Sequence, residues 1–310
     1  MNTTDTTIQS RVAELLSRMT LAEKIGQMFQ TDPGTFLRSV RSELQVSAPV
    51  TGPVSERTLS REVVSNLGSI LSATDAETAY RVQKQFLEMN RLKIPLLFMF
   101  DIVHGFRTIF PIPLGLASSW EPELVERTSR VAAAEGAASG IHVTFAPMVD
   151  LVRDPRWGRV MESPGEDPYL NAVFAAAAVR GFQGNDLKAP DTVAACVKHF
   201  AAYGAAEGGR DYNTVDMSEA TLRNFYLPPY KAGIDAGAEM VMTSFNVYDG
   251  VPATTNPFLL RQVLRREWGF EGVVISDYTS LWETIFHMSS KDGEDAARQG
   301  LDLDVADAVL

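Results

Sequence analysis

The chain has 310 residues, of which 45% are hydrophobic and 22% charged, a composition typical of a folded globular protein. Its formal charge of −11 argues against nucleic acid or an anionic membrane as a partner, because both are bound through clustered Lys and Arg. The single cysteine, Cys196, excludes an internal disulfide, and the four histidines leave no Cys/His spacing of a structural zinc site. We expect no metal and no cofactor.

The first segments of the chain contain no targeting signal. Residues 1–20 lack the positive start and apolar core of a secretion signal, and no run of about 18 apolar residues occurs. Thr20 and Glu23 form the pattern of a capping box, which predicts a helix start. Residues 30–64 contain Pro and Gly breakers without a clear period, so we predict a long loop or insertion there.

Short β-rich runs then alternate with longer helical patterns, which predicts a parallel sheet of the α/β class. Asp75 precedes Ala79, Val82, Phe86 and Met89 at helical spacing, so this segment is expected to be a core helix. Seven runs have the pattern of strands, at residues 68–71, 95–101, 143–147, 193–199, 238–245, 272–277 and 301–304. We predict a TIM-type (β/α)8 barrel over residues 1–310, for which seven strands are one too few.

Four of these runs end in polar side chains, at the position where β/α barrels carry their active sites. Asp101 ends one run, Lys198 and His199 end another, and Asp277 ends a third. A fourth run leads through Asp150 into the dense stretch RDPRWGR at residues 153–159. Any one of them is explained by a helix cap or a salt bridge. Four on one face predict a site, because burying several charges together is costly unless they pair or serve a purpose.

The chemistry of this site follows from which motifs are present. The chain has no GxxxxGKS phosphate loop, no GxGxxG and no HExxH, so nucleotide, dinucleotide and zinc-peptidase functions are excluded. Carboxylates, cations and aromatic rings remain, which are the usual lining of a sugar site. Retaining glycosidases use one carboxylate as nucleophile and a second as acid/base about 5 Å away.

Five stretches of the chain resemble glycoside hydrolase family 3, in particular its bacterial periplasmic-type β-glucosidases. They are FDIVHGFR at 100–107, PIPLGLA at 111–117, RDPRWGR at 153–159, KHFAAYG at 198–204 and WGFEGVVISD at 268–277. The resemblance implies that Asp277 is the covalent nucleophile of an exo-acting β-glucosidase that retains anomeric configuration. Its substrates would be β-glucosides or short β-gluco-oligosaccharides. Its relatives are periplasmic or secreted, whereas the absence of a signal in this chain leaves a cytoplasmic location open.

The resemblance also implies which side chains bind the sugar. Asp101 would hold outer hydroxyls of the glucose, and the same pocket would be lined by Arg107, Arg159, Lys198, His199, Arg210, Met242, Phe245 and Tyr278. Positive charge near Asp277 is expected to favour its ionised form. Glu162 is expected to be an ion-pair partner of Arg159. Phe245 and Tyr278 depart from the Tyr and Trp that the family often has at these positions, which leaves the substrate range open.

No residue of the chain matches the acid/base of the family. The single-domain branch carries a His–Asp pair after its KHF motif, and residues 201–212 lack it. The larger branch takes a glutamate from a following α/β sandwich domain, whereas this sequence ends at Leu310. We therefore expect a fragment without its general acid and with weak activity on natural glycosides. If a local carboxylate does serve, Glu162, Glu166 and Glu207 are the first to test.

Two other functions stay open. Lys198 at a strand end could form a Schiff base, as in an aldolase, if burial lowered the pKa of its ammonium. The missing acid/base is also compatible with a sugar-binding barrel that has no catalytic activity.

Overall fold

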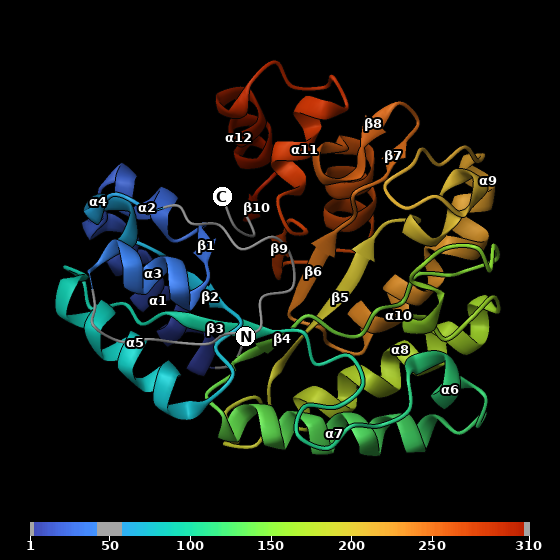
Figure 1. The fold of residues 1–310 in the computed structure, drawn as a ribbon, viewed down its shortest axis with the longest axis horizontal. Coiled ribbons are helices and arrows are strands. Elements are labelled where there is room, and N and C mark those ends of the chain that lie inside the picture. Colours follow the sequence, from blue (N-terminus) through green and yellow to red (C-terminus); the bar gives the residue numbers. More distant parts are fainter. Residues whose placement is uncertain (1–2, 42–57, 307–310) are drawn as a thin grey trace.

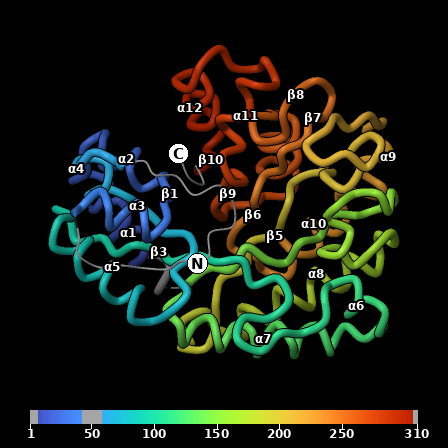
Figure 2. The backbone as a smooth tube through the Cα atoms, in the orientation of Figure 1, coloured from blue at the N-terminus to red at the C-terminus, as the bar shows by residue number. Residues whose placement is uncertain are grey.

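The computed structural model describes residues 3–41 and 58–306. Eight of the strands in this part form one parallel series. Their order is β1-β2-β3-β4-β5-β6-β9-β10, so neighbours in space follow the chain. Figure 2 shows this progression from the N-terminal to the C-terminal end. The bounds are β1 Gln30–Thr31, β2 Ser69–Leu71, β3 Leu97–Phe100, β4 Val143–Thr144, β5 Ala194–Phe200, β6 Met240–Thr243, β9 Val273–Ile275 and β10 Val305–Ala306.

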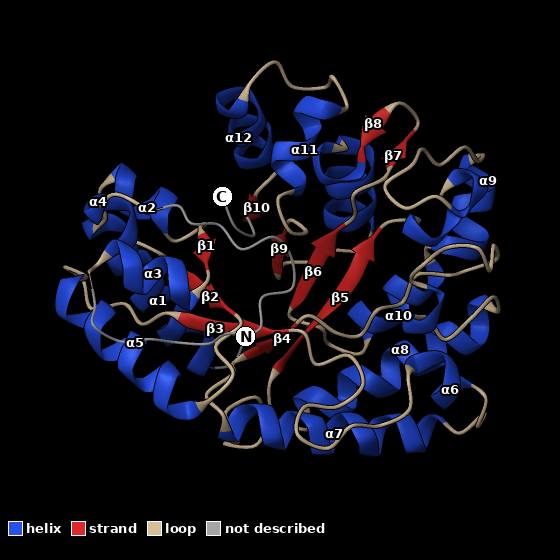
Figure 3. Ribbon diagram, in the orientation of Figure 1, coloured by secondary structure: helices blue, strands red, loops and turns tan. Residues whose placement is uncertain are grey.

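Helices lie outside the strands, which curl around a common centre (Figures 1 and 3). The α-helices are α1 Thr3–Arg18, α2 Leu21–Gly26, α3 Pro33–Ser39, α4 Arg61–Val64, α5 Ala76–Met89, α6 Pro113–Ala117, α7 Pro122–Ala138, α8 Pro168–Gln183, α9 Glu219–Thr221, α10 Pro228–Asp235, α11 Ser280–Phe286 and α12 Gly293–Asp302. Short 3-10 helices are η1 Val160–Glu162, η2 Tyr203–Ala205, η3 Glu207–Gly209 and η5 Ala253–Thr255, and π-helices are η4 Leu222–Tyr226 and η6 Phe258–Glu267. A hairpin pairs β7 Val247–Tyr248 with β8 Val251–Pro252. The predicted α/β barrel class is confirmed.

The structure corrects two of the predicted segments. The loop predicted at 30–64 is wrong at both ends, where β1, α3 and α4 occur, while residues 42–57 lie outside the described part. The strand predicted at 301–304 is also wrong. Helix α12 continues to Asp302, and the turn that follows closes with the backbone N–H of Asp304 bonded to the carbonyl of Leu301 at 3.2 Å. The eighth strand, β10, begins only at Val305.

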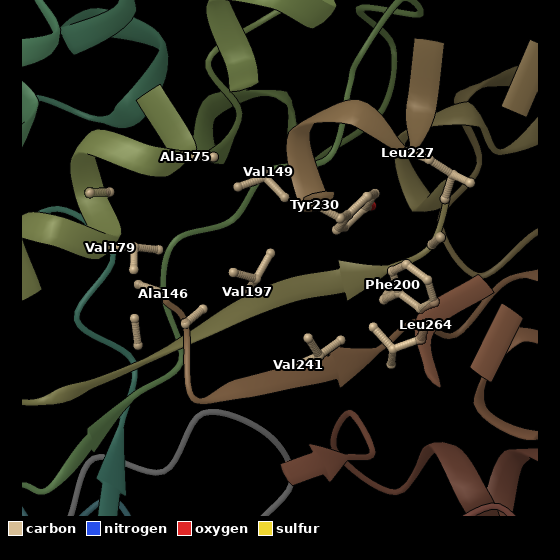
Figure 4. Close-up of a cluster of buried hydrophobic side chains, with 14 of the residues drawn as sticks. Ala146, Val149, Ala175, Val179, Val197, Phe200, Leu227, Tyr230, Val241 and Leu264 are labelled. Atoms are coloured by element: carbon tan, nitrogen blue, oxygen red, sulfur yellow. The ribbon is translucent and has the colours of Figure 1, made fainter. Parts of the chain in front are cut away.

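In β5 and β6, successive residues belong to different hydrophobic clusters, because side chains alternate between the faces of a strand. Val197 and Val241 belong to the outer cluster, which Figure 4 shows between the strands and helices α8 and α10. Their neighbours Cys196, Met240 and Met242 point inward and fill the barrel interior. Burial raises the pKa of the Cys196 thiol, so this cysteine is an inert packing residue.

The helix starts were predicted correctly from local side-chain chemistry. Thr20 and Glu23 make both bonds of the capping box, at 2.8 and 3.2 Å. Asp75 accepts the backbone N–H of Thr78 at 2.8 Å and so begins α5.

Helix α5 offers a direct test of the N-terminal core. Phe86 is 0% exposed in the cluster that joins α3, α4 and α5, so Phe86→Ala should lower the free energy of unfolding by about 3–5 kcal/mol. Tyr80 on the same helix is 67% exposed, and Tyr80→Ala should change it by less than about 1 kcal/mol. Chemical denaturation measures both, and equal losses would contradict this placement of the core.

Candidate active site

A cavity of about 500 Å³ opens at the carboxyl ends of the strands. Eight of the ten predicted site residues line it, and they come from the ends of β3, β5, β6 and β9 and from the loops that follow strands. They are Asp101, Arg159, Lys198, His199, Met242, Phe245, Asp277 and Tyr278. Residues far apart in the chain thus meet at one edge of the barrel, as the strand-end pattern predicted.

A bulge in β5 explains how two consecutive residues reach the same cavity. Val197 pairs with Val241 and Phe200 with Thr243, so β5 advances three residues where β6 advances two. This extra residue interrupts the alternation of faces. Lys198 and His199 therefore both line the cavity, and both are nearly fully buried.

Asp277 follows β9 directly, and its two oxygens have different surroundings. Oδ1 accepts the backbone N–H of Tyr278 at 2.7 Å. Oδ2 is buried and has no hydrogen-bond partner within the described part of the chain. His199 Nε2 lies 3.5 Å from Oδ2. A buried carboxylate oxygen facing a cavity without a partner is available to a ligand atom.

The pKa of Asp277 corrects our expectation about the surrounding cations. Burial raises it to about 6, while the charges of Lys198 and Arg159 act in the opposite direction. The cations do favour the ionised form, as expected, but burial is the stronger effect. Asp277 is therefore a carboxylate that ionises within two pH units of neutrality.

Lys198 and Asp101 form a short ion pair inside the cavity. The ammonium Nζ lies 2.5 Å from Asp101 Oδ1, and the lysine side chain is 4% exposed. Burial acts to lower the pKa of Lys198, but the negative charges of Asp101 and Glu162 outweigh it and raise the pKa above its usual value. Lys198 is thus a fixed cation, and Asp101 is held with its second oxygen available.

Arg159 and Glu162 form a second, bidentate pair, as the sequence indicated. The guanidinium donates to the two carboxylate oxygens of Glu162 at 2.7 and 2.9 Å. Burial acts to raise the pKa of Glu162, but Arg159 outweighs it, so the pKa is lowered. Glu162 is therefore an ionised partner that keeps the guanidinium in place.

Arg107 and Arg210, the other two predicted residues, do not line the cavity. The Arg107 guanidinium donates to the carbonyl of Thr74 at 2.9 Å and lies over the ring of Phe106. Arg210 is exposed at the end of η3. Their contact with a sugar stays a prediction.

The cavity also contains residues that the sequence did not single out, among them Gln30, Tyr212, Thr279 and Glu283. Glu283 lies on α11, six residues after Asp277. Burial raises its pKa to about 7, and the charges of Asp277 and Asp211 add to the effect. Its position on the helix that follows the WGFEGVVISD run was the signal that could have found it. Glu166 and Glu207, which the sequence suggested, do not line the cavity.

Neither a cluster of metal ligands nor a membrane-spanning helix occurs in the described part of the chain. No group of three or more His, Cys, Asp or Glu side chains there is placed to hold a metal ion. None of the described helices combines the length and the apolar character that crossing a membrane requires.

Comparison with known proteins identifies the family. The model of the glycosyl hydrolase family 3 N terminal domain matches residues 20–307. The chain belongs to glycoside hydrolase family 3. It is similar to a periplasmic beta-glucosidase of Salmonella typhimurium, with 44% identity over 96% of this chain and 37% of the relative. A lysosomal beta glucosidase of Dictyostelium discoideum is 31% identical over 94% of the chain and 38% of its own length.

Solved structures agree with this assignment. The crystal structure of a beta-glucosidase from Listeria innocua in complex with glucose has a TM-score of 0.90 and 48% identity, and covers 97% of this chain. This chain covers 42% of that protein. The chain thus spans about two fifths of the length of the family 3 relatives described above.

The pKa of Asp277 can be measured by ¹³C NMR of its carboxyl carbon, assigned with Asp277→Asn. We expect a midpoint near pH 6. Lys198→Met should raise it further, because this cation favours the ionised form. Lys231→Met is the matched control, since Lys231 pairs with Asp235 on the surface, and it should leave the midpoint unchanged. A wild-type midpoint below pH 4, or a downward shift in Lys198→Met, would contradict this electrostatic account.

Proposed function

We propose that this family 3 chain supplies the nucleophile and the glucose-binding groups of a retaining exo-β-glucosidase. The observation that carries the proposal is the unpartnered Oδ2 of Asp277, which faces a cavity of about 500 Å³ beside the Lys198–Asp101 pair. The beta-glucosidase from Listeria innocua has been solved with glucose and, as a mutant, with laminaribiose. We therefore propose terminal β-D-glucosyl residues as the substrate class.

The chemistry follows from the roles of the two oxygens of Asp277. Oδ2 attacks the anomeric carbon, and the bond from that carbon to the leaving oxygen breaks with both electrons on the oxygen. An acid protonates this oxygen, and the glucosyl group remains as an ester on Asp277. Water then releases glucose and regenerates the carboxylate. The bond from the Tyr278 N–H keeps Oδ1 in place, so that Oδ2 is the attacking atom.

Asp101 and the cations position the sugar. A carboxylate can accept from two neighbouring hydroxyls, and Lys198 holds Asp101 in one orientation for this contact. Arg159, fixed by Glu162, adds donors on the same wall. Met242, Phe245 and Tyr278 provide apolar surface against which the faces of a sugar ring can pack.

The raised pKa of Lys198 argues against the Schiff-base alternative. A lysine that attacks a carbonyl must be neutral, which requires a lowered pKa. The pKa of Lys198 is raised instead, because its ammonium is paired with Asp101. The non-catalytic sugar-binding barrel is distinguished from a glucosidase by the labelling experiment below.

The proton donor has two candidates, one among the residues that line the cavity and one outside residues 1–310. Of the carboxyl groups that line it, Glu162 is held ionised by Arg159, whereas Glu283 keeps a raised pKa suited to a donor. The resemblance to larger family members instead implies a glutamate outside residues 1–310. We propose the second arrangement, and Glu283 is its competitor within the chain.

The nucleophile is tested by trapping. An activated 2-fluoro β-glucoside should label wild-type protein at Asp277, identified by peptide mass spectrometry, because a good leaving group needs little protonation. Asp277→Asn should abolish the label while keeping the fold, because it removes the charge with little change of shape. Asp216→Asn, at an exposed position, is the control and should react like wild type. Binding of glucose without any label would favour the sugar-binding barrel.

The proton donor is tested with cellobiose, whose leaving sugar needs a proton. If the acid lies outside residues 1–310, this chain should hydrolyse cellobiose at least about 100-fold less well than an activated aryl glucoside. Azide should then speed release of the glucosyl group, since it needs no general base. Glu283→Gln should leave both results unchanged. Rapid cellobiose hydrolysis that is insensitive to azide and lost in Glu283→Gln would place the acid at Glu283.

A further inference from the structure

A chain of three buried polar groups lies behind the cavity wall. Tyr230, Asp150 and His199 are 0%, 0% and 1% exposed. Tyr230 extends from α10 toward β5 (Figure 4), and its hydroxyl lies 2.6 Å from Asp150 Oδ1 and 2.7 Å from the backbone carbonyl oxygen of His199. Asp150 Oδ2 lies 2.8 Å from His199 Nδ1. His199 thus connects this buried chain to the cavity.

The number of protons available to these groups determines which of them donates each hydrogen bond. The Tyr230 hydroxyl has one proton to donate, yet two oxygens lie within hydrogen-bond distance. If Asp150 were ionised, Asp150 Oδ1 and the carbonyl oxygen of His199 would both be acceptors. Tyr230 could donate to only one of them, and the other short contact would have no proton. If Asp150 carries a proton on Oδ1, it donates to Tyr230, and Tyr230 donates to the carbonyl of His199. Of the two forms, only the neutral one provides a proton for each of the two short contacts of the Tyr230 hydroxyl, and unsatisfied buried groups are costly.

The second oxygen of Asp150 determines the tautomer of His199. Oδ2 accepts the backbone N–H of His199 at 3.1 Å and faces Nδ1 of the same residue. Since the acid proton is on Oδ1, the proton between Oδ2 and Nδ1 belongs to the imidazole. Burial and the charges of Arg159 and Lys198 lower the pKa of His199 well below its usual value. The ring is therefore neutral, and Nε2 carries a lone pair.

Two acceptors then face the same point of the cavity. Nε2 lies 3.5 Å from Asp277 Oδ2, which has no hydrogen-bond partner among the described residues. We propose that Asp150 is a neutral positioning residue that holds His199 in the Nδ1–H tautomer, so that Nε2 accepts a hydroxyl of the ligand beside Asp277 Oδ2. The part that concerns the sugar rests on the proposed function, whereas the tautomer does not.

The electrostatics of Asp150 agree with this assignment. Burial raises the pKa of Asp150 to about 7, against the opposing effects of Tyr230, Arg159 and the His199 N–H, while Glu162 adds to the rise. The opposite arrangement is an ionised Asp150 beside an imidazolium, in which Nε2 would be a donor. The two arrangements differ in where the protons lie, and this difference is measurable.

Asp150→Asn separates them, because an asparagine reproduces a neutral aspartic acid. Its NH₂ can donate to Tyr230, and its carbonyl can accept both N–H groups of His199. Long-range ¹H–¹⁵N NMR of histidine-labelled protein, assigned with His199→Gln, should show the Nδ1–H tautomer in wild type and in Asp150→Asn. Asp150→Ala, which removes the acceptor, should lose this preference. An imidazolium in wild type at pH 7, or an Nε2–H tautomer in Asp150→Asn, would overturn the proposal.

Tyr230→Phe keeps the test decisive if Asp150→Ala does not fold. It retains the contact between Oδ2 and Nδ1, so the Nδ1–H tautomer should persist although the free energy of unfolding falls. A switch to imidazolium would overturn the proposal. The functional readout is the rate of Asp277 labelling by the activated 2-fluoro β-glucoside, which should stay within about threefold in Asp150→Asn and fall at least about tenfold in Asp150→Ala. Absence of labelling in wild type would refute the proposed function but leave the tautomer result intact.

Discussion

The buried ammonium of Lys198 is the charge on which the cavity depends. The charges of Asp101 and Glu162 raise the pKa of Lys198, and the charge of Lys198 in turn lowers the pKa of Asp277. Removing an isolated charge from water is costly, and partners must compensate for it. Asp101 does so directly, and the remaining positive field partly offsets the burial of Asp277. The site is therefore one coupled electrostatic unit.

The barrel provides the rigid support for this unit. The β5 bulge turns Lys198 and His199 to one side, and the register of β5 with β6 and of β6 with β9 sets their distance from Asp277. Behind them, fully buried Asp150 and Tyr230 fix the imidazole through short contacts. Well-oriented groups on strands and helices lose little conformational freedom when a ligand binds, which favours both affinity and rate.

Much of this arrangement could be predicted from the sequence, and the exceptions have physical causes. Apolar runs ending in Asp101, Lys198 and Asp277 located the site, because strand ends of a barrel converge. Strand β1 was missed because two polar residues show no alternation, and 301–304 was misassigned because Leu-Asp alternation also fits the end of an amphipathic helix. Arg107 does not line the cavity, and Glu283 does although it was not predicted. Neither residue follows a strand directly, so the strand-end pattern could not place them. The size of the Asp277 pKa shift depends on burial, which no local pattern encodes.

The alternation of side chains between two hydrophobic clusters along β6 has an evolutionary consequence. Along β6, Met240 and Met242 face the narrow barrel interior, whereas Val241 faces the helices. Substitutions at adjacent positions of β6 are therefore constrained by different sets of packing residues. A residue that replaces Met240 or Met242 must fill the same volume in the barrel interior. Met242 also borders the cavity. A substitution at Met242 can therefore change the wall of the cavity while Val241 maintains the packing against the helices.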